Sequence, residues 1–569
     1  MRIAQAVRTL CLAPVLAAVA CTNNGSTSDA GNTSLCAAAC ATGLSCTQNA
    51  DFPGAACTAP CNVDAGTGCP TGMVCAPQST GAFCVHTCTT GPTAPACPDG
   101  LTCSTTGIGS VCVSPRESIS SGINCAPPTL FVGPPAGPAS DPGVCVNPRV
   151  TSALPAGDVQ SLGVHQTGTP LLFTVPQGAI GFSIVSQAVD AGAFIVYQGF
   201  TLPNLPIPTP LLTPQGATFF DDISPPVDQT TANLTNASPN AYVGVLTFPN
   251  TTPALAIAED GGLPGGSWTL VVSDYAHECL TIGCTDGGSA SNTYDVSVLV
   301  RPGPFPATGH LAADIYIVSD TLDAGAALGT AQVQQFAARY AEFYAQAGVC
   351  ISSVTLHDIP AWARAKYASL AVDDAELPCS DFRQMMTLAE PGTTMALFLV
   401  DELTATVSPD AGTIVGLDGA IPGPATFNGT IAGGAVASLA DLLSDTGCGV
   451  SFNPSCGPDV VAYVAAHETG HYLGLYHPTE LTGDFFDPLV DTPACVCALC
   501  ELNSTARAAC SGANGAAPTL VLPAQCGQQT QECGGSDLLM FWILDNGSVG
   551  RFSPEQAAMV RANPLVTQP

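Results

Sequence analysis

Residues 467 to 477 read His467-Glu468-Thr469-Gly470-His471-Tyr472-Leu473-Gly474-Leu475-Tyr476-His477. His467 and His471 are four residues apart, so on a helix they share one face and can bind one metal ion together. Glu468 follows the first histidine, where its carboxylate can reach a water on that metal without being a ligand. Gly474 can adopt the positive φ that ends a helix, and the resulting turn brings in His477 as a third imidazole. Three nitrogen ligands and one open position are typical of a catalytic zinc ion, whereas a structural zinc site has four protein ligands.

The residues before this motif predict a buried helix that leads directly into it. Residues 459–466 are almost entirely apolar, and Pro458 and Asp459 suit the first turn of a helix. An H-E-x-x-H pentapeptide alone arises by chance in unrelated proteins, but the added glycine and third histidine make an accidental match very rare. We therefore expect the three histidines to bind Zn²⁺ and Glu468 to act as general base in peptide-bond hydrolysis.

These eleven residues resemble the extended zinc motif of the metzincin metallopeptidases at every fixed position. The resemblance covers about residues 306–569 and implies a zinc endopeptidase domain. Metzincins carry a methionine in a turn beneath the metal, and Met540 within residues 536–542 is the matching residue, with a packing role. Residues 489–493 and 552–556 resemble the pappalysin and cytophagalysin branch.

One position departs from the pattern of this branch. Several metzincins have a tyrosine two residues after the methionine, where it helps to stabilise the reaction intermediate. The corresponding residue here is Trp542, which has an N–H donor and no ionisable hydroxyl. The resemblance therefore does not extend to a tyrosine-assisted step. Pappalysin relatives tend to cut next to basic residues, and Asp545 is a candidate for an acidic specificity pocket.

The composition of the 569-residue chain limits its partners. It contains 12 Lys+Arg against 44 Asp+Glu, which gives a formal net charge of −32. Such a surface repels nucleic acid and anionic membranes, so we expect no nucleic-acid partner. Acidity is also an ordinary means of keeping an extracellular protein soluble. The expected partner is a protein or peptide substrate, and the sequence leaves the oligomeric state open.

The N-terminus predicts export. Residues 1–20 combine a basic start with an apolar stretch that is too short to span a bilayer, as in a signal peptide. Cys21 follows Ala18-Val19-Ala20, which resembles a relaxed bacterial lipobox. A lipid on Cys21 would anchor the protein to the membrane through a flexible tether, residues 21–35. The alternative is ordinary cleavage after Ala20, so we expect a bacterial cell-surface or outer-membrane lipoprotein or a secreted protein.

The 28 cysteines also favour export, because those outside the signal region fall into even local groups that predict disulfides within modules. Twelve of them, in residues 36–112, form three repeats that are each too short for a hydrophobic core. We expect these repeats to form a stiff stalk, with binding of a partner or substrate as the alternative. The other predicted groups are Cys125/Cys145, Cys279/Cys284, Cys350/Cys379, Cys448/Cys456 and the six cysteines from Cys495 to Cys533. A second metal site is the alternative to disulfides for the cysteines of residues 495–500.

The middle of the chain predicts an accessory domain. Residues 113–156 read as a Pro/Gly-rich linker with a Cys125/Cys145 pair. Residues 157–302 contain short apolar strands and frequent turns, which are typical of an antiparallel β-sandwich. Asp221, Asp222 and Asp274 are candidates for a structural Ca²⁺ site, although solvated turn carboxylates explain them equally well.

The sequence therefore predicts a multidomain protein: disulfide-rich N-terminal repeats, an antiparallel β-sandwich, and an α/β (α+β) metzincin-type zinc peptidase domain over 306–569. Within the last domain, residues 433–439 are the candidate edge strand to which an extended peptide substrate would pair. One alternative is a surface binding or adhesion lipoprotein with a latent or inactive peptidase domain, which the intact Glu468 argues against. Another is that the residues before about 306 form a removable pro-region.

Overall fold

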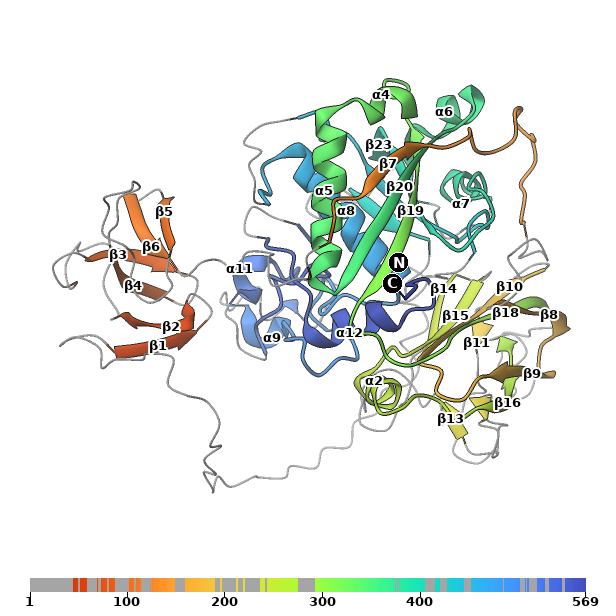
Figure 1. Ribbon diagram of the computed structural model, residues 1–569, viewed down its shortest axis with the longest axis horizontal. Helices are drawn as coiled ribbons and strands as arrows, with labels where there is room; N and C mark the ends of the chain where they lie inside the picture. The colour runs from red at the N-terminus through yellow and green to blue at the C-terminus, as the bar shows by residue number, and fades with distance from the viewer. Residues whose placement is uncertain are drawn as a thin grey trace. The chain divides into compact units, whose positions relative to one another are not determined.

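The computed structural model divides into two compact units, Met1–Ser114 and Pro115–Pro569. It describes short segments between residues 45 and 113 and most residues from 123 to 568 (Figure 1). In the second unit, the stretches of two or more residues that it does not describe are 115–122, 149–158, 190–194, 197–210, 213–217, 221–235, 241–242, 275–291, 405–414, 420–426, 445–451, 502–506, 511–518, 528–531 and 545–547.

The first unit contains three β-hairpins, one in each cysteine repeat. Their strands are β1 (Ser45–Asn49) with β2 (Phe52–Thr58), β3 (Met73–Gln78) with β4 (Gly81–His86), and β5 (Thr102–Thr106) with β6 (Gly109–Val113). Every hairpin places two cysteines opposite each other, at Cys46/Cys57, Cys75/Cys84 and Cys103/Cys112. Cys84 is disulfide-bonded to Cys69. The described hairpins therefore pair their cysteines in equivalent registers.

Two antiparallel sheets form the middle of the chain. The five-stranded sheet has the order β14-β15-β10-β18-β8, with strands β8 (Val159–Gln166), β10 (Gly181–Ala188), β14 (Asn236–Asn240), β15 (Val243–Phe248) and β18 (Thr293–Arg301). The four-stranded sheet has the order β13-β12-β16-β9, with strands β9 (Pro170–Val175), β12 (Leu211–Leu212), β13 (Thr218–Phe220) and β16 (Gly266–Val271). Helix α2 (Thr252–Glu259) and the strand pair β11 (Ile195–Val196) with β17 (Ser273–Asp274) complete this region.

The two sheets share one apolar core, as in a β-sandwich. Strand β9 alternates exposed and buried residues, so one of its faces turns inward. Phe173 from this strand, Phe182 from β10 and Trp268 from β16 meet in the core, with ring centroids 6.1 to 6.3 Å apart. Contacts between aromatic rings of this kind add to the stabilisation from burial alone.

The C-terminal half is built on a six-stranded mixed sheet, in the order β24-β25-β22-β19-β20-β7. Its strands are β7 (Thr129–Val132), β19 (Gly309–Val318), β20 (Val349–Asp358), β22 (Met395–Val400), β24 (Gly416–Asp418) and β25 (Ala435–Ser438). All neighbours are parallel except β24 and β25. A small parallel pair, β21 (Ser369–Ala371) with β23 (Glu402–Thr404), lies beside the sheet's helices.

Helices cover both faces of this sheet (Figure 1). The described helices of the C-terminal half, not all of which lie on the sheet, are α4 (Ala324–Leu328), α5 (Ala331–Gln346), α6 (Ala361–Tyr367), α7 (Asp381–Met386), α8 (Gly457–Tyr472), α9 (Cys497–Cys500), α11 (Pro523–Cys526) and α12 (Pro554–Ala562). On β19, Ile315 and Ile317 pack in the core with α5 and α8, whereas Tyr316 and Val318 pack in a separate core with α6 and α7. Successive side chains of β19 point to opposite faces of the sheet, so this strand contributes to the apolar cores on both faces.

Residues 125–148, which we call the strap, differ from the predictions in two respects. Cysteines 125 and 145 do not pair with each other: Cys125 bonds to Cys350 and Cys145 to Cys379, over sequence separations of 225 and 234 residues. Strand β7 within the strap pairs in parallel with β20. Residues 113–156 are therefore not merely a linker, and a boundary at residue 306 is too late. Local spacing favoured nearby partners, but the extended strap brings each cysteine to a distant segment.

The predicted edge strand is also corrected. Residues 433–439 contain β25, which lies inside the sheet between β22 and β24. The edge is β24, only three residues long. Its Gly-Leu-Asp sequence is too short and too poor in β-branched residues to predict a strand.

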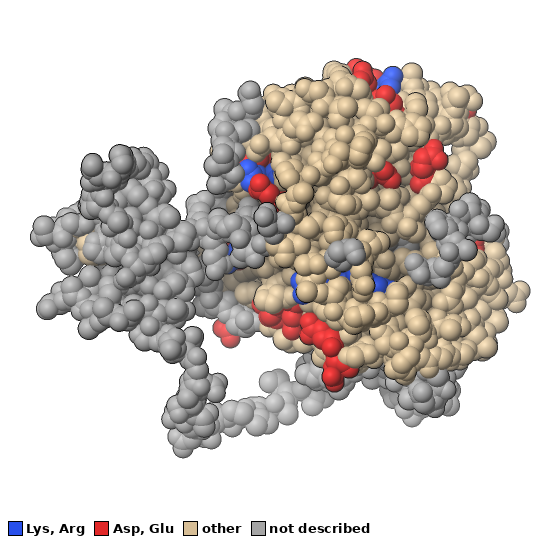
Figure 2. All heavy atoms as spheres, in the orientation of Figure 1, with Lys and Arg blue, Asp and Glu red and all other residues tan. Residues whose placement is uncertain are grey.

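The β-sandwich packs directly on the six-stranded region. Val185, Val243 and Val245 of the sandwich form one apolar cluster with Phe427 and Ile431. Uncharged residues make up most of the face shown in Figure 2, and acidic side chains gather over α2 and α12 at this junction. The sandwich and the sheet thus behave as one compact unit rather than as domains joined by a free linker.

Candidate metal centre

Helix α8 carries the first two histidines and the glutamate, and buried polar contacts fix its position. In its first turn, the fully buried Asp459 accepts hydrogen bonds from Arg339 Nε at 3.2 Å and from the Asn453 N–H at 2.8 Å. Further along, Tyr344 OH donates to the Ala466 carbonyl at 2.8 Å. Since a buried ion pair is costly to break, α8 has little freedom to shift against α5.

The structure brings the three predicted ligands together. Nε2 of His477 lies 3.2 Å from Nε2 of His467 and 3.0 Å from Nε2 of His471. His467 and His471 are buried, and His477 is partly exposed. Nitrogens bound to one tetrahedral zinc at its usual Zn–N distance would lie about 3.3 Å apart. The two separations from His477 are close to that value, and the ligand atoms of all three histidines lie within 4.8 Å of one another.

The other ring nitrogen of each histidine has its own partner. Nδ1 of His467 lies 2.7 Å from the Leu539 carbonyl, and Nδ1 of His471 lies 2.8 Å from the Leu475 carbonyl. Nδ1 of His477 lies 3.1 Å from Oε1 of Glu480. Such partners orient the imidazoles that bind metals. The sequence analysis named none of them, although a carboxylate three residues after His477 is a readable signal.

The donor set fits a metal cation. A carbonyl oxygen only accepts hydrogen bonds, so Nδ1 of His467 and of His471 must carry the proton. Their Nε2 atoms then present lone pairs, and both face Nε2 of His477. Burial, followed by the nearby His477, lowers the pKa of His467 to about 3. The same two causes hold the pKa of His471 well below its ordinary value. Neutral imidazoles whose lone pairs converge are suited to share a cation.

Glu468 lies in the same buried environment. Its side chain is 7% exposed, and burial raises its pKa to about 8. A carboxylate with a pKa near neutrality is suited to take and return a proton. The edge strand approaches it closely, because a Cβ on Gly416 would lie 2.4 Å from Oε1 of Glu468. Gly416 is a site residue that the sequence analysis missed, since a lone glycine after an unpatterned stretch gives no signal.

Gly474 ends α8 as predicted. It has a φ of 102°, and its N–H bonds to the His471 carbonyl at 2.9 Å. The next N–H, of Leu475, bonds to the Gly470 carbonyl at 2.9 Å. These bonds satisfy carbonyls that the last helical turn leaves open. The turn redirects the chain so that His477 reaches the other two histidines.

Met540 packs against the histidine helix at Gly470. It is fully buried, and a Cβ on Gly470 would lie 2.3 Å from its Sδ. Gly470, between Glu468 and His471, therefore leaves room for the methionine. The turn that contains Met540 also provides the Leu539 carbonyl that contacts His467. It serves as both an apolar floor and a hydrogen-bond partner.

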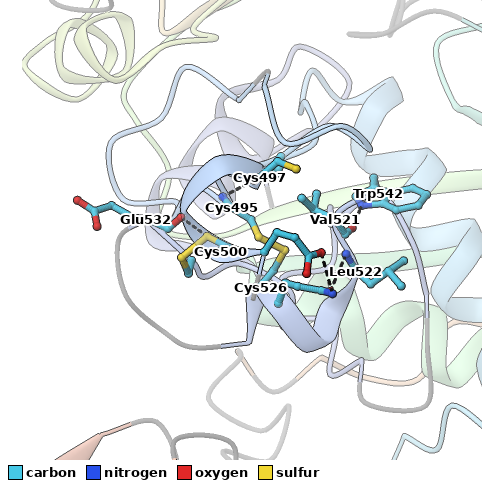
Figure 3. The surroundings of a disulfide bond; sticks show 12 residues. Cys495, Cys497, Cys500, Val521, Leu522, Cys526, Glu532 and Trp542 are labelled. Carbon is cyan, nitrogen blue, oxygen red and sulfur yellow. Dashed lines mark hydrogen bonds between the residues drawn. A yellow bond between two sulfur atoms is a disulfide. The ribbon is translucent and has the colours of Figure 1, made fainter. Parts of the chain in front are cut away.

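Trp542 points into the cysteine-rich segment. Its Nε1 donates to the Val521 carbonyl at 2.8 Å (Figure 3). Val521 in turn donates its N–H to the Leu481 carbonyl at 3.0 Å, next to Glu480. The indole N–H is therefore engaged in linking the methionine turn to the segment that follows His477.

The six cysteines from Cys495 to Cys533 are all paired. The bonds are Cys495–Cys526, Cys497–Cys510 and Cys500–Cys533. The prediction of local disulfides is confirmed here, and the alternative of a second metal site is wrong. The paired segment also fixes the chain near the histidines, since Cys495 N–H donates to Thr479 Oγ1 at 2.9 Å and Cys497 N–H to the Gly483 carbonyl at 3.2 Å.

Several predictions lie outside the described residues. These are the signal peptide and tether over 1–35, the Cys21 lipid anchor, the Cys279/Cys284 pair, Cys448 of the Cys448/Cys456 pair, and the specificity candidate Asp545. For the Ca²⁺ candidates, Asp221 and Asp222 also lie outside, and of Asp274 only the backbone is described. Cys456 itself is disulfide-bonded.

No protein-family model matches this chain, and no curated protein matches it either. Among the helices that the structure describes, none combines the length and apolar character needed to cross a bilayer.

Proposed function

We propose that this chain is an exported zinc-dependent endopeptidase of the metzincin type, which hydrolyses peptide bonds of extracellular proteins. The observation that carries the proposal is the convergence of three imidazole nitrogens, 3.0 and 3.2 Å apart, beside the buried carboxylate of Glu468. His467, His471 and His477 would hold the zinc ion. When bound, zinc supplies a Lewis acid that polarises a carbonyl and makes water nucleophilic near neutral pH.

The remaining chemistry belongs to the chain's own residues. The carboxylate of Glu468 takes a proton from the attacking water and later gives this proton to the leaving amine. Each imidazole ring is kept in its orientation by a contact at its own Nδ1 atom. The partners are the carbonyls of Leu539 and Leu475 and the carboxylate of Glu480. Strand β24 is the sheet edge nearest Glu468, and its backbone is suited to pair with an extended peptide.

The test uses the full mature chain, secreted through an oxidising compartment, beside Glu468→Gln. The variant keeps the size of the side chain and removes its basicity. We expect both proteins to bind one zinc ion and only the wild type to cleave a peptide mixture, with a rate loss of at least about 100-fold in the variant. A wild type that binds zinc but cleaves nothing would favour the alternative, a surface binding or adhesion lipoprotein with an inactive peptidase domain. A folded wild type without zinc would refute the proposal.

A further inference from the structure

Helix α12 lies between the β-sandwich and the metal centre. On the sandwich side, Gly181 approaches so closely that a Cβ there would lie 2.3 Å from the Ala562 carbonyl. Arg301, the last residue of β18, donates from Nη1 to the Asn563 carbonyl at 2.7 Å. These contacts join the sandwich to the C-terminal end of α12, where helix carbonyls lack partners within the helix.

Asn563 connects this junction to the end of the histidine helix. Its Nδ2 donates to the Leu473 carbonyl at 3.0 Å, and its Oδ1 accepts from the Leu565 N–H at 2.9 Å. Both Asn563 and Leu473 are 1% exposed. Leu473 follows α8 directly and precedes Gly474, so its carbonyl belongs to the turn that leads to His477.

Arg301 is an unusual residue for this junction. It is 4% exposed, and burial lowers its pKa to about 10. Its Nη1 partner is a carbonyl rather than a carboxylate, and within the described part of the chain its Nη2 has no hydrogen-bond partner. Burying a guanidinium is costly unless hydrogen bonds or an opposite charge compensate it, and the C-terminus of a helix provides a partial negative charge. Arg301 thus holds the carbonyl of Asn563, the residue that caps the C-terminal end of α12, in one position.

We propose that Arg301 and Asn563 are positioning residues through which the β-sandwich fixes the turn carrying His477, and so sets the metal affinity of the three-histidine site. The inference rests on the proposed function for the identity of the metal. The sandwich then acts as part of the scaffold of the metal centre, in addition to any role in binding substrate.

The same helix offers a matched control. Arg561 donates from Nη1 to the Ala347 carbonyl at 2.7 Å, and its guanidinium lies 5.9 Å from the Phe305 ring. Ala347 lies between α5 and β20, away from the turn after α8. Arg561→Met and Arg301→Met therefore each remove one guanidinium–carbonyl hydrogen bond, but only the second loosens Asn563.

The experiment compares the full chain with Arg301→Met, Asn563→Asp and Arg561→Met. Asn563→Asp keeps the acceptor for Leu565 and replaces the donor to Leu473 with an oxygen. Zinc dissociation constants come from competition with a chelator, and the Co²⁺ absorption spectrum reports the ligand geometry. We expect zinc affinity to fall about 10- to 100-fold in the first two variants and to change less than about twofold in Arg561→Met. The Co²⁺ spectrum should change only in the first two.

Wild-type zinc affinity and an unchanged Co²⁺ spectrum in Arg301→Met and Asn563→Asp would overturn the inference, even if both proteins unfold at lower temperature. If Arg301→Met does not fold, Arg301→Lys replaces it, and its zinc affinity should lie between those of wild type and Asn563→Asp. An unchanged affinity in Arg301→Lys together with an unchanged affinity in Asn563→Asp would overturn the inference equally. Because zinc affinity does not depend on hydrolysis, a wild type without peptidase activity would refute the proposed function and leave this inference standing.

Discussion

The two edges of the six-stranded sheet are finished in opposite ways. At one edge, β7 belongs to the strap, which two disulfides join to the rest of the sheet and helices. Trp362 Nε1 donates to the Pro138 carbonyl at 2.8 Å, and Gln384 bonds to the backbone of Val146 at 2.8 Å in both directions. At the other edge, β24 is three residues long and lies against Glu468.

This difference suggests that one edge serves the stability of the fold and the other the proposed chemistry. A long exposed strand edge invites unwanted pairing with other chains, and strand β7 of the strap pairs with residues 353–356 in the middle of β20. The β24 edge is short, and residues 405–414 and 420–426 on either side of it are not described. A short backbone edge beside the carboxylate that we propose as general base would align an extended peptide substrate. We therefore assign a structural role to the β7 edge and a functional one to the β24 edge.

The largest expected effect comes from removing the strap and the β-sandwich together. Residues 306–569 alone should not fold as a stable monomer, whereas residues 115–569 should. Without the strap, the edge of β20 is exposed and Cys350 and Cys379 lose their partners. Size-exclusion chromatography and thermal unfolding of both secreted fragments check this. A monomeric 306–569 fragment with a Tm within about 3 °C of the longer one would contradict the assignment.

The second prediction concerns a substitution in β24, the edge to which we assign a functional role. Gly416→Val should lower kcat/KM by about 100-fold, because even the first added carbon would displace Glu468 or Val464, which lie 2.4 and 2.6 Å from it. Zinc content should stay unchanged. Gly329→Ala is the control, since the nearest atom to its added carbon is 3.7 Å away. Full peptidase activity in Gly416→Val would show that β24 does not constrain the glutamate.

The third prediction concerns the removal of one of the two disulfides that hold the strap, while the strap itself is kept. Replacing both Cys145 and Cys379 by serine should lower the free energy of unfolding by about 2–4 kcal/mol, because the unfolded chain gains freedom when a long loop opens. Denaturant unfolding measures this. Peptidase activity of the folded variant should remain within about twofold of wild type. A loss of activity as large as that of Gly416→Val would place the strap in the chemistry.

The smallest effect is a pH dependence confined to the strap. His357 bonds through Nδ1 to the Pro134 carbonyl at 2.9 Å and through Nε2 to Asp314 at 3.2 Å. Burial alone would lower the pKa of His357, but the hydrogen bonds to Asp314 and Pro134 outweigh it and raise this pKa. A raised histidine pKa stabilises the fold below the unfolded value near 6.5, and this stabilisation is lost as the pH rises through the folded pKa.

Hydrogen exchange measures this pH effect. After correction for the intrinsic rate, amides of residues 129–136 should exchange faster at pH 8.5 than at pH 5.5, while those of β22 should not. His357→Gln removes the charge and should abolish the difference. Equal protection of the strap at both pH values in the wild type would contradict the role of the imidazolium.

The sequence by itself determined the three-histidine cluster to a large extent. Histidines spaced four residues apart on a helix must share a face, and a glycine with positive φ must turn the chain, so local geometry alone predicts that His467, His471 and His477 can meet. Local disulfides among Cys495–Cys533 follow from the same short-range reasoning. Met540 was found through the resemblance, because nothing in its immediate surroundings shows where it packs.

Only the tertiary structure decided what lies far apart in the chain. It paired Cys125 with Cys350 and Cys145 with Cys379, made β24 rather than β25 the sheet edge, and brought Arg301 to Asn563. Each of these contacts depends on how strands are ordered in a sheet and how one sheet packs on another. Backbone pairing is almost independent of side-chain identity, so neither spacing nor composition encodes it legibly. The three histidines could be predicted from the sequence because they lie within eleven consecutive residues. The residues that hold them in place could not be predicted, because they come from distant parts of the second unit.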